Sequence, residues 1–116
     1  MSKGPEAQTQ ALILDYLAAK GVLTFRMNSG AMRSEYKGKQ RFMRFGSPGM
    51  ADLLAFRVER IELDGIPCDV SMATWIECKA PKGKQSDLQR SFQQQVERHG
   101  HRYVLARSLE DVQGVL

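Results

Sequence analysis

A nearly unbroken run of apolar residues between 51 and 58 constrains the fold of this 116-residue chain more than any other feature. The run reads ADLLAFRV, and Asp52 is its only charge before Arg57. Because alternate side chains of a strand point to opposite faces of a sheet, a strand of this composition needs cover on both faces. The run therefore predicts a strand within a sheet that is flanked by helices.

The first helix is bounded by residues that suit its two ends. Pro5 stands in the first turn, where the missing N–H is not needed, and Gly21 suits the position just after a helix. Within this helix Ile13 and Leu17 share one face, and Glu6 lies further back along the same face. A carboxylate is thus expected at the polar end of an otherwise buried stripe.

Two more helices and one strand are expected in the C-terminal third of the chain. Ser86 and Gln89 have the spacing of a capping box, and Gly100 ends the helix that they begin. Ser108 suits the start of a last helix, and residues 103–106 read as a strand between the two helices. The buried stripe of the first of these helices is expected to consist of Leu88, Phe92 and Val96.

Turn signals divide the middle of the chain. Residues 46–49 predict a turn before the apolar run, and Asp64-Gly65 predicts a hairpin that leads into a strand ending at 73–79. Residues 22–27 and 40–45 read as strands, and 28–39 as a long functional loop. Since the strands do not alternate regularly with helices, the sequence predicts an α/β fold with a mixed sheet, in the core order αβββαβ.

Length and composition are those of one soluble domain. A chain of 116 residues fits a single domain spanning 1–116, and its 42% hydrophobic and 26% charged residues are ordinary for a globular protein. No segment approaches the ~20 apolar residues of a membrane span, and the first twenty residues lack a secretory signal, so a cytoplasmic protein is expected. Cys68 and Cys78 lack the spacing of a zinc site and are expected to be reduced.

Basic residues are concentrated in one segment. Residues 26–49 hold six basic side chains and one acidic side chain, whereas residues 59–69 hold four acidic side chains and one basic side chain. Such polarisation suits a polyanion that docks on one side, although a solvated charged face gives the same pattern. Charge alone leaves both interpretations open.

The segment WIECK at 75–79 carries the clearest chemical signal. Alternation along a strand sends Trp75, Glu77 and Lys79 to one face, and Ile76 and Cys78 to the other. An exposed edge strand could carry the same charges for solubility. However, Trp75 on the charged face indicates that a buried surface meets a cleft there.

Asp52 is the second candidate for this cleft. It follows a Pro-Gly turn directly, so it could instead cap backbone N–H groups of that turn. If the two strands pair, Asp52 and Glu77 meet, and carboxylates with waters are the ligands that a hard divalent cation prefers. Lys79 beside such a metal could orient the attacking water and stabilise the transition state, or it could only neutralise the two carboxylates.

The succession of these motifs resembles a known nuclease family. The segment GMAD at 49–52, followed by ECK at 77–79, resembles the PD-(D/E)xK superfamily and, more narrowly, the VRR-NUC domain. In that family a helical Glu, a Gly-x-Pro-Asp segment, an E-x-K strand and a Gln early in the next helix follow one another. Ala51 departs from the pattern, because the family usually has Pro there, but that Pro carries no chemistry. The residues that match in type and order are Glu6, Asp52, Glu77, Lys79 and Gln89.

The resemblance implies a restriction-endonuclease-like fold and hydrolysis of DNA phosphodiesters that depends on Mg²⁺ or Mn²⁺. It also implies that Lys79 acts on the water and that Gln89 belongs to the catalytic set, although Gln89 equally fits the capping box. The metal ligands that it implies are Glu6, Asp52, Glu77 and the backbone carbonyl of Cys78.

The same resemblance suggests a role for the basic segment in holding DNA. Phosphate contacts of this kind position a substrate but do not read its sequence. Stand-alone members of the family look like dimeric junction resolvases, so a homodimer acting on branched DNA such as a Holliday junction is expected. A nickase, a flap or linear-duplex nuclease, and an inactive nucleic-acid-binding module are the alternatives. The candidate phosphate contacts are Arg33, Lys37, Lys39, Arg41 and Arg44.

Overall fold

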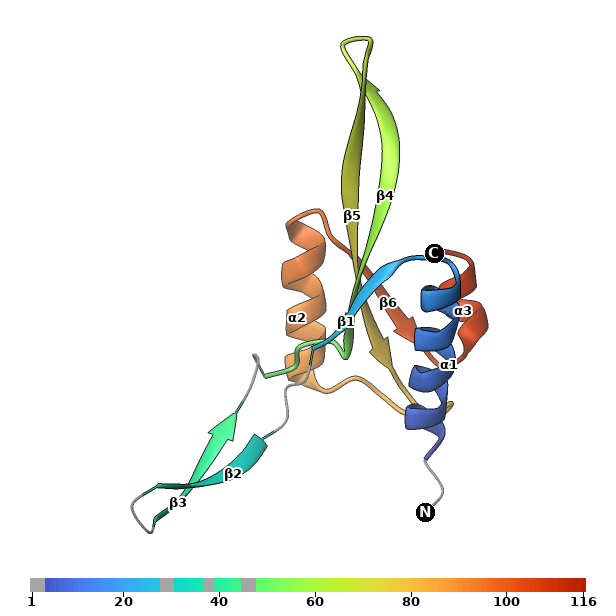
Figure 1. Cartoon of the computed structure of the whole chain (residues 1–116). Coiled ribbons are helices and arrows are strands. Elements are labelled where there is room, and N and C mark those ends of the chain that lie inside the picture. The colour runs from blue at the N-terminus through green and yellow to red at the C-terminus, as the bar shows by residue number, and fades with distance from the viewer. Residues whose placement is uncertain (1–3, 28–30, 37–38, 45–47) are drawn as a thin grey trace.

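A mixed four-stranded sheet forms the centre of the molecule (Figure 1). The computed structural model describes residues 4–27, 31–36, 39–44 and 48–116, and for 31–36 and 39–44 it describes the backbone alone. The strands of the sheet lie in the order β1-β4-β5-β6, with antiparallel pairing throughout except between β5 and β6, which are parallel. Their bounds are β1 Leu23–Arg26, β4 Leu53–Leu63, β5 Ile66–Cys78 and β6 Arg102–Ala106.

Helices cover both faces of this sheet. On one face α1 (Pro5–Ala19) and α3 (Leu109–Gln113) enclose the core, whose fully buried side chains include Ile13, Leu17 and Ile76. On the other face α2 (Asp87–Arg98) packs Phe92 edge-on against Trp75, with ring centroids 4.9 Å apart. The predicted α/β fold is thus confirmed. No helix in the described ranges is long and apolar enough to cross a membrane.

The apolar run at 51–58 is covered for only part of its length. Leu53 and Ala55 are fully buried in the core, but Val58 is 68% exposed. The expectation of cover on both faces is therefore wrong for the end of the run. The reason is that β1 pairs with β4 only as far as Phe56, so the sheet narrows beyond that point.

Strands replace most of the long loop that was expected at 28–39. Residues Ala31–Tyr36 form β2, which pairs antiparallel with β3 (Lys39–Arg44) as a separate two-stranded sheet. The strand predicted at 40–45 is confirmed over 40–44, and Phe45 lies outside the described residues. The loop prediction is wrong for 31–36 and for Lys39, and the rest of 28–39 lies outside the described residues. β2 has no clear alternation of apolar and polar residues, and backbone pairing does not require such alternation.

The second helix begins where its capping box predicts, but its buried stripe is shorter than expected. The Ser86 side chain accepts a hydrogen bond from the Gln89 backbone, and the Gln89 side chain accepts one from the Ser86 backbone. Phe92 and Val96 are half-buried rather than fully buried, and Leu88 is 59% exposed. The prediction is therefore wrong for Leu88, whose side chain is exposed while its backbone approaches Gly49 closely.

Gly49 approaches this first turn so closely that no side chain fits. A Cβ built on Gly49 would lie 2.4 Å from the backbone carbon and oxygen of Leu88, and its φ of +81° is a conformation that favours glycine. We therefore expect Gly49→Ala to lower the free energy of unfolding by about 3 kcal/mol, measured by urea denaturation. Gly65→Ala is the matched control, since Gly65 has a φ of +77° but open space around it. If both variants lose the same free energy of unfolding, the close contact of Gly49 with the Leu88 backbone adds nothing to the effect of the positive φ.

β4 and β5 continue well past the sheet as a two-stranded ribbon (Figure 1). β1 pairs with residues 53–56 of β4, and β6 pairs with residues 74–78 of β5. Residues 57–72, here called the β-ribbon, therefore pair only with each other. The predicted hairpin turn is confirmed at its tip, where Asp64 and Gly65 both have positive φ, 51° and 77°.

Candidate active site

Three carboxylates from three separate elements converge at one end of the sheet. Glu6 lies in the first turn of α1, Asp52 immediately precedes β4, and Glu77 is the last residue but one of β5. One carboxylate oxygen from each of them lies within 4.8 Å of the other two. The structure thus brings together the three acidic residues that the sequence singled out.

Strand pairing explains why Asp52 and Glu77 meet. β4 and β5 are antiparallel with Leu53 opposite Ile76, so the next residue outward on each strand is Asp52 or Glu77. Asp52 Oδ2 accepts a hydrogen bond of 2.8 Å from the backbone N–H of Cys78, and the Asp52 carbonyl accepts one of 2.7 Å from Met27. The side chain of Asp52 therefore bonds across to β5, which argues against a role limited to capping its own turn.

Glu77 is buried in a way that disfavours its charge. Only 2% of its surface is exposed, and its Oε2 atom is buried with no hydrogen-bond partner in the described part of the chain. Burial raises the pKa of Glu77 to about 8, the negative charge of Asp52 adds to the shift, and the charge of Lys79 opposes it. β5 lies between β4 and β6, so the alternative of a charged, exposed edge strand is wrong.

Gln89 makes both contacts that the sequence left open as alternatives. Its Oε1 accepts a hydrogen bond of 2.9 Å from the Ser86 backbone in the capping box. Its Nε2 lies 3.3 Å from Glu77 Oε1 and donates to it. The start of α2 is therefore tied to the acidic cluster through one side chain.

Lys79 stands directly after β5 and is half-buried. Its backbone N–H donates a hydrogen bond of 2.9 Å to the carbonyl of Ala106, which extends the pairing of β5 with β6. Its charge is close enough to the cluster to lower the pKa of Glu77. Backbone pairing thus holds Lys79 next to the carboxylates, as the alternation along the strand predicted.

A second polar group behind the site was not anticipated from the sequence. Gln85 Nε2 donates to Gln93 Oε1 at 2.9 Å and to the Tyr103 hydroxyl at 3.2 Å. These contacts fix the segment between β5 and α2, which carries Lys79 at its start. No sequence signal could have found the group, because its members become neighbours only when α2 packs on β6.

The donor set fits a hard divalent cation. Three carboxylates converge, and the unpartnered, buried Glu77 Oε2 offers a lone pair that no described group satisfies. The Cys78 thiol does not belong to this set, because it lies in the core and burial raises its pKa to about 12. Of Cys78, only the backbone carbonyl is left as a possible ligand.

The side chains of the basic residues expected to contact phosphate are not described by the structure. Lys37 is not described at all. The positions of the other four on β2 and β3 are known from the backbone register, but their side chains are not described. Their role stays a prediction; the four are Arg33, Lys39, Arg41 and Arg44.

Comparison with known proteins agrees with the geometry of the site. The family model of the VRR-NUC domain matches residues 5–110, which is nearly the whole chain. No curated protein and no solved structure matches the chain. The matched range contains the positions of Glu6, the segment at 49–52, the E-x-K triplet and Gln89. The chain therefore belongs to the VRR-NUC family, whose members are nucleases of the PD-(D/E)xK type.

Proposed function

We propose that this chain is a Mg²⁺- or Mn²⁺-dependent endonuclease that hydrolyses phosphodiester bonds of branched DNA as a homodimer. The observation that carries the proposal is the convergence of Glu6, Asp52 and Glu77 around a buried, unpartnered carboxylate oxygen, with a lysine beside them. A nuclease needs positive charge next to the scissile phosphate. Three carboxylates without a cation would repel that phosphate.

Each residue of the site has a role in this proposal. Glu6, Asp52, Glu77 and the Cys78 carbonyl hold the cation, which would supply Lewis-acid stabilisation of the phosphate oxygens and of the attacking water. Lys79 orients the water and offsets the negative charge that builds up on the phosphate. Gln89 keeps the Glu77 carboxylate in position through the contact at Oε1.

The basic segment around β2 and β3 holds the DNA in this proposal. Its support is the local excess of positive charge, which contrasts with the acidic residues at 59–69. Two such subunits related by a two-fold axis would present two active sites to opposed strands, which suits a four-way junction. The candidate phosphate contacts are Arg33, Lys37, Lys39, Arg41 and Arg44.

A cleavage panel tests this function. Four-way junctions, flaps, single strands and linear duplexes are incubated with the protein, with and without Mn²⁺, and Asp52→Asn serves as the matched variant. We expect metal-dependent incision, fastest on the junction, and its loss in Asp52→Asn without loss of the fold. DNA binding with no incision of any substrate would instead identify a nucleic-acid-binding module. Full activity of Asp52→Asn would refute the assignment of the site.

A further inference from the structure

An exposed aromatic ring lies beside the acidic cluster on the same face of the sheet. Phe25 of β1 pairs with Leu54 of β4, which pairs with Trp75 of β5, so the three side chains form one row across the sheet. Glu77 follows Trp75 by two residues and therefore lies on the same face. Asp52 precedes Leu54 by two residues, which makes it the diagonal neighbour of Phe25, and such neighbours lie roughly 7–8 Å apart.

Helix α2 covers one half of this row and leaves the other half open. Phe92 of α2 packs edge-on against Trp75, which is buried. At the other end of the row, on the edge strand β1, Phe25 is 48% exposed. Its ring lies against Phe56 with the centroids 6.1 Å apart and the planes at 76°, a favourable edge-to-face contact. The ring of Phe25 is thus held in position while much of its surface is free.

Apart from Asp52, the neighbours of Phe25 on this face are apolar. By register they are Leu54 and Phe56 on β4, and Leu23 precedes Phe25 on β1. A paired double helix presents phosphates to a protein surface, and phosphates call for cations or hydrogen-bond donors. An unpaired base presents a π-face, and single strands are held by stacking their bases on aromatic side chains. The surface around Phe25 therefore fits an unpaired base and does not fit the backbone of a duplex.

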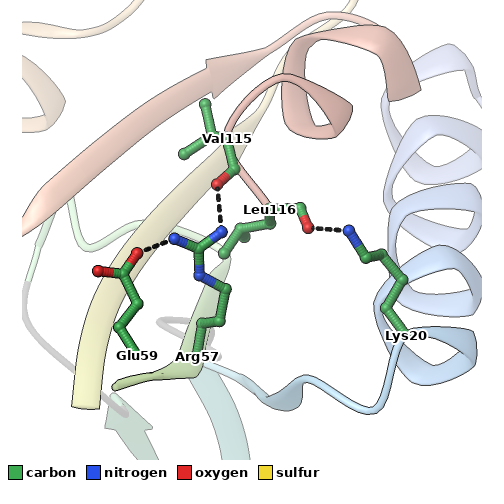
Figure 2. A network of polar contacts seen from close by, with 5 residues as sticks. All are labelled: Lys20, Arg57, Glu59, Val115 and Leu116. Carbon is green, nitrogen blue, oxygen red and sulfur yellow. Dashed lines mark hydrogen bonds and ion pairs between the residues drawn. The ribbon is translucent and has the colours of Figure 1, made fainter. Parts of the chain in front are cut away.

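The opposite face of the sheet has no comparable free surface in the described part of the chain. α1 and α3 cover it, and the cations at the edge of that cover are already paired. Arg57 donates to the Glu59 carboxylate and to the Val115 carbonyl (Figure 2). Lys20 donates to the Leu116 carbonyl. A nucleotide next to the metal site is thus left with the face of Phe25.

We propose that Phe25 is a base-stacking platform, which holds the unpaired base of a nucleotide next to the phosphate that is cut. The inference rests on the function proposed above and narrows its substrate to DNA that exposes an unpaired base at the point of incision, as an open branch point or a flap does. The carboxylates hold the metal at the phosphate, and the base lies one row away on the ring. In a linear duplex this base stays stacked inside the helix, and taking it out costs unpairing and unstacking energy.

Equilibrium binding to a flap and to a linear duplex tests the platform. Ca²⁺, which also suits carboxylate ligands, replaces Mn²⁺ during the measurement. Phe25→Ala should weaken binding of the flap by roughly 5- to 100-fold, the range expected when a base loses its aromatic partner. Its binding of the duplex should change by less than about twofold, because no base is stacked there. Phe25→Tyr keeps the ring and should bind the flap within about threefold of the parent.

Leu23→Ala is the matched control. Leu23 is 59% exposed on the same strand and the same face, but it lies one row further from the acidic cluster. This variant should bind the flap like the parent. Equal losses for flap and duplex in Phe25→Ala, or equal effects of Phe25→Ala and Leu23→Ala, would overturn the proposal. So would a variant Phe25→Ala that sediments as a smaller oligomer and binds DNA like the parent, since that result assigns Phe25 to a protein interface.

An abasic nucleotide tests the same contact from the side of the DNA, with the parent protein intact. It is placed in turn at each position around the branch of the flap. At one position it should weaken parental binding by a factor similar to that of Phe25→Ala. At that position Phe25→Ala should lose no further affinity, because both changes remove one contact. Parental binding that is insensitive to every abasic position, or losses that add, would refute the platform.

The outcomes also distinguish this inference from the proposed function. A parent that binds the flap through Phe25 and cuts no DNA would retain the platform and refute the nuclease. Metal-dependent cleavage that Phe25→Ala leaves unchanged on every substrate would retain the nuclease and refute the platform.

Discussion

Lys79→Met is expected to bind Mn²⁺ and DNA at least as well as the parent, while its rate of DNA cleavage falls by about 10²-fold or more. Methionine keeps the apolar stem and removes the charge. An ammonium cannot ligate a cation, so its loss spares the carboxylates that hold the metal. It does remove a preorganised positive group from the place where charge builds up in the transition state, an effect of the expected size. Backbone pairing of Lys79 with Ala106 does not depend on the side chain, so its position is kept.

Single-turnover cleavage at saturating enzyme and Mn²⁺ measures this effect without contributions from binding. Lys82→Met is the matched control, because Lys82 is exposed and follows Lys79 by only three residues. If Lys79 only neutralises Asp52 and Glu77, bound metal takes over that task. The variant would then cut at a rate within about threefold of the parent, a difference worth well under 1 kcal/mol of barrier.

Glu77→Gln is expected to stabilise the metal-free protein at alkaline pH and to abolish cleavage. The pKa of Glu77 is about 8 in the folded chain and near 4.5 when the chain is unfolded. Between these values the folded state holds the proton and the unfolded state has lost it, so the free energy of unfolding falls as pH rises. Glutamine has no proton to lose. The variant should therefore gain stability over the parent, with little difference below pH 4.5 and a gain of about 2–5 kcal/mol above pH 8.

Denaturant titrations of metal-free protein between pH 4 and 9 test this linkage. Glu62→Gln is the control, because Glu62 lies exposed on the ribbon and should give a difference that does not vary with pH. Adding Mn²⁺ should make the parent more stable than Glu77→Gln, since the cation binds and stabilises the parent through its charged carboxylate. A gain from Glu77→Gln that is the same at pH 4 and pH 9 would show that the buried carboxyl is not protonated in the folded chain.

Local signals were enough for much of the secondary structure and for the membership of the acidic cluster. The capping box at Ser86, the Asp64-Gly65 turn and the glycine after α1 act on backbone atoms within a few residues, so their effect is readable from the sequence. The period of two along β5 likewise places Glu77 and Lys79 on one face. The order of motifs indicated the VRR-NUC family, and the family match confirms it.

Tertiary structure decided what depends on contacts between distant segments. Gly49 lies close to the backbone of the first turn of α2, and Leu88 in that turn is exposed, although the helical period alone predicts that it is buried. The pairing of β2 with β3 and the length of the ribbon follow from register between strands, which no local pattern specifies. The raised pKa of Glu77 likewise depends on contacts between distant segments. A carboxyl group has an ordinary pKa until the fold removes its water and brings Asp52 beside it, and that environment exists only in the folded chain.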